Sequence, residues 1–140
     1  MPELPRFHLA FPVRDLVEAR EFYRRVLGCR EGRSSHDWVD FDFFGHQIVA
    51  HLSISCGEGE AHNEVDGEQV PIRHFGIILS QTDWKGLRDR LRASGVTFII
   101  EPQTRFKGKA GEQFTMFLRD PSGNALEFKA FADDRGVFAR

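Results

Sequence analysis

Residues 7–11 read FHLAF and residues 73–77 read RHFGI, and these two stretches decide the fold of the chain. In each of them a histidine is followed two residues later by a small residue, Ala10 or Gly76. Large apolar residues occupy the alternate positions, and such an alternation predicts a strand with one buried face. The histidine and the small residue then share the opposite face, where the small residue leaves room beside the histidine. The chain therefore contains a duplicated unit that repeats its histidine.

Each of the two predicted strands leads into a helix that ends at a glycine. The stretches with helical spacing, and the glycines after them, are Leu16–Leu27 with Gly28 and Trp84–Ala93 with Gly95. Glycine just beyond the last helical turn is a common stop signal. Asp15 is the predicted N-cap of the first helix, with Glu18 completing a capping box, and Thr82 is the predicted N-cap of the second.

Three further strands are expected after each helix, so that the order βαβββ occurs twice. They are predicted near residues 29–32, 37–43 and 46–55 in the first module, and near residues 96–100, 113–119 and 125–131 in the second. The sequence therefore predicts an α+β fold in which two βαβββ modules form an open, curled mixed sheet, a cup with its helices on the outside.

The same pattern sets the boundaries within a single domain, residues 1–140. The first module is predicted to span residues 6–55 and the second residues 73–131, and residues 132–140 form a C-terminal tail. Residues 56–72 between the modules are acidic, contain glycines and lack periodicity. They are predicted to form a connecting loop, either a mobile lid or a solvated linker.

The charge and composition of the chain narrow the classes of partner. The chain carries 19 Lys and Arg against 21 Asp and Glu, whereas nucleic-acid-binding domains usually have a basic excess. No apolar run approaches the roughly 20 residues of a membrane span, and residues 1–6 contain no apolar signal segment. Two cysteines without CxxC spacing fit a reduced protein. We therefore expect a cytoplasmic protein that binds neither nucleic acid nor membrane.

Glu127 joins the two leading histidines as a candidate metal ligand. It alternates with Leu126 and Phe128 in the last predicted strand, so it faces the interior of the cup, as His74 does. A carboxylate in such a phenylalanine-rich interior is costly unless it is paired or ligated. His8, His74 and Glu127 match the two-histidine, one-carboxylate set that holds a divalent metal, typically Fe(II), and leaves coordination positions open. For either histidine alone, a hydrogen-bonded core residue is the alternative interpretation.

Three further residues are candidates for the same site. His51 lies in the last strand of the first module, where the duplication gives it the position of Glu127, as a fourth ligand or as an acid/base group. Arg105 and Lys107 carry positive charge that would attract an anionic substrate, or they belong to a solvated hairpin tip. The remaining histidines, expected at the surface, are His36, His46 and His62.

Residues 117–127, FLRDPSGNALE, together with the paired βαβββ order and the leading histidines, resemble the vicinal oxygen chelate superfamily. This superfamily includes glyoxalase I, extradiol ring-cleaving dioxygenases, fosfomycin-resistance enzymes and bleomycin-binding proteins. The resemblance covers residues 6 to about 131. Residues 41–47, FDFFGHQ, and 105–108, RFKG, also resemble small proteins described as predicted extradiol-type dioxygenases.

The resemblance implies an enzyme whose metal chelates two neighbouring oxygen atoms of a small-molecule substrate. His8, His74 and Glu127 match the iron-binding positions of extradiol dioxygenases, in which a histidine near the metal, here His51, serves as catalytic acid/base. Glyoxalase I usually has a glutamate ligand where this chain has His51. The implied activity is that of an Fe(II) dioxygenase for a catechol-like or other vicinal-oxygen substrate, with Mn, Ni, Co or Zn as alternative metals. Superfamily members are commonly dimers, so a homodimer is expected, with or without exchange of modules between chains.

Two other functions are alternatives to the dioxygenase. A glyoxalase-like isomerase, epimerase or lyase would use the ligand set without O₂, with the metal as a Lewis acid. A metal-free protein would use the fourteen phenylalanines to bind a small hydrophobic molecule. Turnover under nitrogen distinguishes the first alternative from an oxygenase, and metal analysis distinguishes the second.

Overall fold

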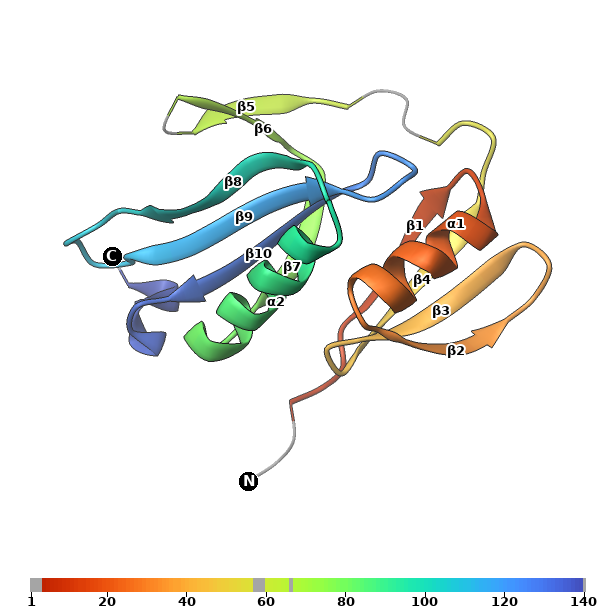
Figure 1. Cartoon of the computed structure of the whole chain (residues 1–140), viewed down its shortest axis with the longest axis horizontal. Helices are drawn as coiled ribbons and strands as arrows, with labels where there is room; N and C mark the ends of the chain where they lie inside the picture. Colours follow the sequence, from red (N-terminus) through yellow and green to blue (C-terminus); the bar gives the residue numbers. More distant parts are fainter. Residues whose placement is uncertain (1–3, 57–59, 66, 140) are drawn as a thin grey trace. The chain divides into compact units, whose positions relative to one another are not determined.

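The computed structural model describes residues 4–56, 60–65 and 67–139, and its strands and helices follow one order twice (Figure 1). The described residues exclude residues 1–3, residues 57–59 and 66 of the predicted loop, and residue 140 of the predicted tail. Contacts divide the chain into two units, Met1–Glu58 with Asp120–Asn124, and Gly59–Arg119 with Ala125–Arg140. Each unit holds one βαβββ module, which confirms the predicted α+β class and the duplication.

The first unit is built on a four-stranded, open mixed sheet. Its strands are β1 (His8–Val13), β2 (Arg30–Ser34), β3 (Trp38–Phe43) and β4 (His46–Leu52). Their order across the sheet is β1-β4-β3-β2, with β1 parallel to β4 and the other neighbours antiparallel. Phe11 and Val13 of β1 are buried, whereas His8 and Ala10 are exposed, as the alternation predicts.

The helix of the first unit has two parts with different winding. It begins as α1 (Leu16–Arg20) after Asp15, whose side chain accepts a 2.9 Å hydrogen bond from the backbone N–H of Glu18. Asp15 is therefore the N-cap, as predicted. The chain then continues as a π-helical segment, Glu21–Val26, where one continuous α-helix was expected. Gly28 ends the helical stretch in the left-handed region, at φ +81°.

Tyr23 of the π-helical segment is the centre of the first unit's core. It is fully buried, and its ring lies 5.4 Å from that of Phe11 and 5.2 Å from that of Phe41, measured between centroids. Its hydroxyl donates a 2.8 Å hydrogen bond to Oδ2 of Asp120, which is also buried. Burial raises the pKa of both groups, so the hydroxyl stays a donor at neutral pH.

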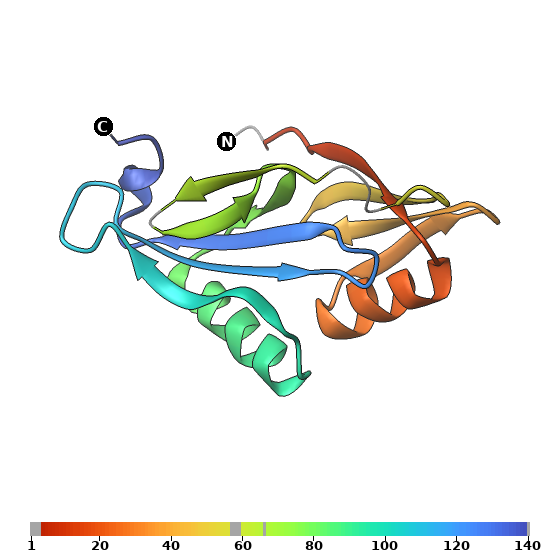
Figure 2. The same ribbon diagram turned by 90° about the horizontal axis from the view of Figure 1, so that it is seen from above.

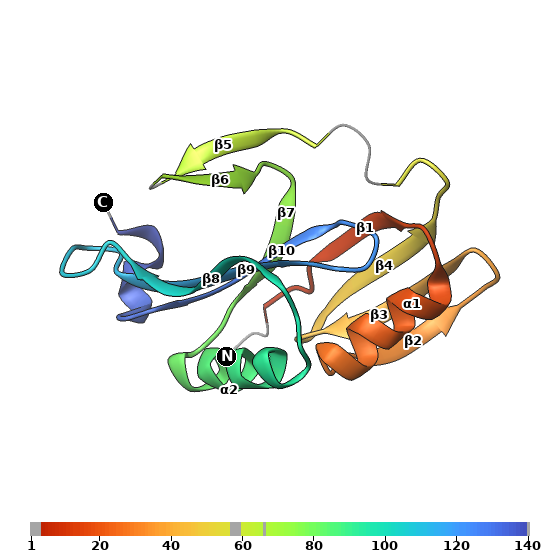
Figure 3. The same cartoon turned by 45° about the horizontal axis from the view of Figure 1, so that its top comes forward.

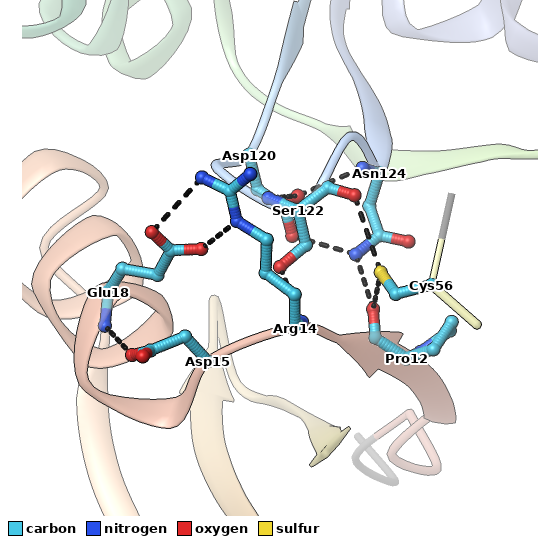
Figure 4. Close-up of polar contacts among 8 residues, drawn as sticks. All are labelled: Pro12, Arg14, Asp15, Glu18, Cys56, Asp120, Ser122 and Asn124. Carbon is cyan, nitrogen blue, oxygen red and sulfur yellow. Dashed lines mark hydrogen bonds and ion pairs between the residues drawn. The ribbon is translucent and has the colours of Figure 1, made fainter. Parts of the chain in front are cut away.

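The turn Asp120–Asn124 belongs by its contacts to the first unit, although the strands on either side of it belong to the second. Figure 4 shows how its polar side chains meet the end of β1. The Ser122 hydroxyl accepts a 2.9 Å hydrogen bond from the backbone N–H of Arg14, and the Asn124 amide donates one of 2.7 Å to the carbonyl of Pro12. Asp120 also accepts the backbone N–H groups of Ser122 and Asn124. The turn thus fastens the end of β1 with several hydrogen bonds.

Tyr23→Phe is expected to lower the free energy of unfolding by about 1–3 kcal/mol, because a buried carboxylate loses a donor. Chemical denaturation at neutral pH measures the loss. Ser35→Ala is a matched control, since its hydroxyl also donates a 2.8 Å hydrogen bond to a carboxylate, that of Asp37, but at an exposed site. The control is expected to change the free energy by less than about 0.5 kcal/mol. Equal losses in the two variants would contradict the prediction.

The second unit repeats this sheet. Its strands are β7 (His74–Ile78), β8 (Phe98–Arg105), β9 (Gln113–Arg119) and β10 (Ala125–Phe131). Their order is β7-β10-β9-β8, and β7 is again parallel to the strand beside it while the other neighbours are antiparallel. The two units therefore share one topology, in which the strand led by a histidine lies next to the last strand of its module.

Helix α2 (Gln81–Ala93) packs on one face of this sheet through Trp84, Leu87 and Leu91, which are buried. The Trp84 indole N–H donates a 2.9 Å hydrogen bond to the carbonyl of Phe128. The predicted cap, Thr82, is wrong: the cap is Ser80, whose hydroxyl accepts the backbone N–H of Asp83. Ser80 has the extended backbone that an N-cap requires, whereas Thr82 already lies within the helix.

The predicted connecting loop contains a β-hairpin, made of β5 (His62–Val65) and β6 (Glu68–Pro71). The hairpin and α2 lie on opposite faces of the second sheet (Figures 2 and 3). Val70 of β6 is buried in a cluster with Ile100 and Phe117. The expectation of an aperiodic loop is therefore wrong for this part, because an apolar residue in an acidic segment anchors a strand pair.

The predicted C-terminal tail also contains regular structure, a 3₁₀ helix at Asp134–Phe138. Its N-cap is Asp133, whose side chain accepts the backbone N–H of Arg135. Within the part of the chain that the structure describes, no helix has both the length and the apolar character needed to cross a membrane.

Candidate metal centre

Two of the predicted ligands, His74 and Glu127, lie side by side in the second unit. β7 begins at His74 and runs parallel to β10, with Gly76 opposite Glu127 in the register. Nε2 of His74 is 3.3 Å from Oε1 of Glu127. Both side chains line a pocket of about 200 Å³, together with Phe75, Gly76, Ile77, Ile78 and Lys129.

The hydrogen bond at the other ring nitrogen decides what His74 offers to this pocket. Its Nδ1 lies 2.6 Å from the carbonyl oxygen of Pro71, which can only accept, so Nδ1 carries a proton. In the neutral ring Nε2 then carries a lone pair, and this nitrogen faces a carboxylate oxygen of Glu127. Two acceptors at this distance repel each other unless a proton or a metal cation lies between them. The pair therefore forms a binding site for a cation, which is a proton when no metal is present.

The surroundings of Glu127 keep its carboxylate ionised and fixed. The side chain is 6% exposed, Oε2 accepts a 2.5 Å hydrogen bond from the Thr115 hydroxyl, and Oε1 lies 3.8 Å from Nζ of Lys129. Burial acts to raise the pKa of Glu127, but the hydrogen bonds from His74 and Thr115 and the charge of Lys129 together lower it. The hydrogen bond to Glu127 raises the pKa of His74 against the opposing effect of burial. Both shifts favour an ion pair of the two groups when no metal is bound.

A divalent metal fits the donor atoms of this pair. Two ligand atoms each about 2.1 Å from a metal, and roughly at right angles, lie about 3.0 Å apart, close to the observed 3.3 Å. Imidazole nitrogen suits iron and zinc, and carboxylate oxygen completes the open facial set used by non-haem Fe(II). Within the described residues of either unit, no cluster of three or more His, Cys, Asp or Glu side chains could hold a metal. His74 and Glu127 would therefore supply two ligands of a larger set.

His8, the third predicted ligand, belongs to the first unit. It opens β1 and is exposed on the face opposite the buried Phe11 and Val13. Its Nδ1 lies 2.8 Å from Oε1 of Gln47, the residue opposite it on β4. Each module thus begins with a histidine whose Nδ1 is hydrogen-bonded, and the complete set of three ligands remains a prediction.

His51 is not at the position that the duplication was expected to give it. In the second unit Gly76 pairs with Glu127, and in the first unit the equivalent Ala10 pairs with Val49. The counterpart of Glu127 is therefore Val49, and His51 lies two residues further along β4. His51 keeps the face of Val49, since side chains alternate along a strand. A role for His51 as a fourth ligand or as an acid/base group remains a prediction, without the support of an equivalent position.

Arg105 and Lys107 lie at the end of β8 and in the turn that follows it. Arg105 is largely buried, with its guanidinium 6.0 Å from the ring centroid of Phe106, and Lys107 is exposed. The described residues around the His74–Glu127 pocket include a different cation, Lys129. A role for Arg105 and Lys107 in substrate binding remains a prediction.

Three residues around the pair were not predicted from the sequence: Lys129, Thr115 and Pro71. Lys129 follows Glu127 by two positions, so the strand alternation already indicated that the two share a face. Thr115 lies opposite Lys129 on β9, and only the pairing of β9 with β10 identifies it. Pro71 belongs to the hairpin that was expected to be a loop.

Two modules of identical topology, each led by a histidine, define the vicinal oxygen chelate class of fold. The family model of the Glyoxalase/Bleomycin resistance protein/Dioxygenase superfamily matches residues 7–128, and the chain belongs to this superfamily. No curated protein matches the sequence.

Solved structures extend this result. A glyoxalase/bleomycin resistance protein/dioxygenase from Alicyclobacillus acidocaldarius is 38% identical, with 96% of each chain covered and a TM-score of 0.82. A fosfomycin resistance protein from Listeria monocytogenes is 16% identical over 97% of this chain and 98% of that one, with a TM-score of 0.68. Lactoylglutathione lyase from Agrobacterium tumefaciens is 18% identical over 93% and 96%, with a TM-score of 0.65. At these lower identities the last two show the fold alone.

Proposed function

We propose that the protein is an Fe(II)-dependent dioxygenase of the extradiol type, with His8, His74 and Glu127 as the metal ligands. The observation that carries this proposal is the pairing of His74 Nε2 with Glu127 Oε1, two acceptors 3.3 Å apart that require a cation between them. The substrate is a small molecule with two neighbouring oxygen atoms, such as a catechol. Mn, Ni, Co and Zn are the alternative metals.

The register of the first unit supports a set of three ligands rather than four. Val49 stands where the second unit has Glu127, so this position offers no ligand. Two histidines and one carboxylate leave coordination positions open on a metal that prefers six ligands. When bound, Fe(II) would hold both substrate oxygens and activate O₂ for the reaction.

The residues of the pocket have separate roles in this proposal. Thr115 holds the Glu127 carboxylate with Oε1 toward His74, and the Pro71 carbonyl fixes the ring that carries Nε2. Lys129 lines the pocket and would attract a deprotonated substrate oxygen. The rings of His74 and Phe117 form a T-shaped pair with centroids 4.9 Å apart, which limits the orientations of the His74 ring.

Three earlier candidates keep proposed roles in substrate chemistry. His51 would take the proton of a substrate hydroxyl and return it to the product, which is the task of a general acid/base. Arg105 and Lys107 would attract an anionic group on the substrate. We also propose that the enzyme is a cytoplasmic homodimer, and that the partner chain supplies His8 if the modules are exchanged. Cys29 and Cys56, the two cysteines of the chain, fit a reducing compartment.

Anaerobic reconstitution with Fe(II), followed by an oxygen electrode and a panel of catechols, tests the proposed activity. We expect oxygen consumption with at least one catechol and one equivalent of iron per complete site. Tight iron binding without oxygen consumption for any substrate would contradict the dioxygenase. Turnover under nitrogen with Ni, Co, Mn or Zn would favour an isomerase or lyase instead. Protein that binds no divalent metal would indicate a binding protein of the same fold.

A further inference from the structure

Three polar side chains form a chain of hydrogen bonds across the sheet of the first unit. They come from adjacent strands, His8 from β1, Gln47 from β4 and Asp40 from β3. His8 Nδ1 lies 2.8 Å from Gln47 Oε1, and Gln47 Nε2 lies 3.0 Å from Asp40 Oδ2. His8 and Gln47 are directly opposite each other in the register, which keeps the first of these contacts short.

The direction of this chain follows from which groups can donate. A carboxylate can only accept, so the Gln47 amide must present its NH₂ group to Asp40. Its oxygen then faces His8, and an amide oxygen also can only accept. Nδ1 of His8 therefore carries the proton, and Nε2 of the neutral ring is left as a lone pair. If the amide were reversed, Nδ1 would accept and Nε2 would carry the proton.

Asp40 sets the direction of this chain of hydrogen bonds. It is an acidic residue that is only 7% exposed, which is unusual for a carboxylate. Its second oxygen, Oδ1, is buried and has no hydrogen-bond partner among the described residues. The carboxylate lies next to Gly32, where an added Cβ atom would be 3.5 Å from it. A buried carboxylate with one unpaired oxygen costs stability that a simple structural role does not require. Among the described residues, the carboxylate accepts a hydrogen bond from the Gln47 amide, and this bond orients Gln47.

We propose that Asp40 and Gln47 are positioning residues of the metal centre, and that together they hold His8 as the tautomer whose Nε2 can bind a metal. This step rests on the proposed function in that it takes His8 as a ligand. Ligating histidines generally donate their other N–H to an acceptor that fixes tautomer and ring orientation. The second unit gives His74 the same tautomer by another means, the carbonyl of Pro71. Both leading histidines are thus held with Nε2 unprotonated. A backbone carbonyl does this for His74, and the side chains of Gln47 and Asp40 do it for His8.

The test begins with the metal-free protein, in which histidine nitrogen and carbon chemical shifts report each tautomer. The spectra are recorded above the pH at which histidine titrates. We expect His8 to be Nδ1-protonated in the wild type. It is expected to lose this preference in Gln47→Leu, which removes the amide, and in Asp40→Asn, where the Gln47 amide is free to reverse. Gln69→Leu, at an exposed position on β6, is the control and leaves the His8 signals unchanged. An unchanged His8 tautomer in Gln47→Leu would overturn the proposal.

A double variant separates orientation from simple loss of structure. In Asp40→Asn with Gln47→Glu, an amide at position 40 donates to a carboxylate at position 47, which accepts the proton of His8 Nδ1. This pair is expected to restore the wild-type tautomer that Asp40→Asn alone loses. Failure of the double variant to restore it, with both variants folded by circular dichroism, would count against the chain of hydrogen bonds as its cause.

Titration with Co²⁺ then measures the effect on the metal centre. Gln47→Leu and Asp40→Asn are expected to weaken Co²⁺ binding about 10–100-fold, the usual effect of losing a ligand's outer partner, and the double variant to recover most of it. A changed tautomer with unchanged Co²⁺ affinity would overturn the positioning role. A wild type that binds no Co²⁺ or Fe²⁺ would overturn the proposed function instead, and the tautomer measurements would still decide the hydrogen-bond chain.

Discussion

Gly76→Ala is expected to disrupt the second sheet and to lower the free energy of unfolding by more than about 3 kcal/mol. Gly76 lies opposite Glu127 in the β7–β10 register, and the two backbones approach very closely there. A Cβ at position 76 would lie 1.5 Å from the backbone oxygen of Glu127 and 2.6 Å from its carbonyl carbon. These are backbone atoms, so no side-chain rotation relieves the overlap and the strands must separate.

Gly86→Ala is the matched control for this variant. Gly86 lies within α2, and a Cβ built there meets no atom within 4 Å. Alanine is favoured over glycine inside a helix, so this change is expected to raise the free energy of unfolding by up to about 1 kcal/mol. Chemical denaturation of both variants compares a glycine needed for close approach with one that is not. A Gly76→Ala protein within about 1 kcal/mol of wild type would contradict the observed register.

Gly76 has a different purpose in the structure from the one predicted from the sequence. A small residue two positions after a histidine was interpreted as leaving space beside that histidine. The structure shows that it allows β10 to approach β7. Both interpretations use the same residue type, and only the position of the neighbouring backbone distinguishes them. Ala10, its counterpart in the first unit, has a Cβ, so the two modules differ in how tightly their first and last strands meet.

The sequence predicted the face of the strand on which each of these residues lies, but it did not predict the register between paired strands. Alternation assigned His8 and Glu127 to their faces because side chains of a strand point to opposite sides in turn. A shift of two residues leaves every side chain on its original face, so alternation cannot detect it. The assignment of His51 to the position of Glu127 failed by such a shift, and Val49 is the true counterpart.

Hydrogen bonds between residues distant in the sequence were the other feature that could not be predicted. The contacts of Tyr23 with Asp120, and of His74 with Pro71, depend on which segments meet in the fold. Pro71 was also obscured because an acidic, glycine-containing segment carries little strand pattern, although Val70 within it is buried. Local signals were more reliable where a single residue sets the geometry, as Asp15 does at the start of α1.

His74→Ala is expected to weaken divalent-metal binding by more than about a hundredfold, because even the outer partners of a ligand are worth about 10–100-fold. The variant loses the Nε2 lone pair and leaves the Glu127 carboxylate with Thr115 and Lys129 as its remaining partners. Elemental analysis of protein purified without chelator, followed by Co²⁺ titration, measures the loss.

His62→Ala is the control for this variant, since His62 also lies near a glutamate, with Nε2 3.6 Å from Oε1 of Glu60, but at an exposed site. It is expected to keep the metal content of the wild type. The fold of His74→Ala should persist, because its ring is partly exposed and the β7–β10 pairing does not depend on it. If folded His74→Ala retains the wild-type amount of metal, then the cation between the two acceptors is a proton only, and His74 and Glu127 are an ion pair without a catalytic metal.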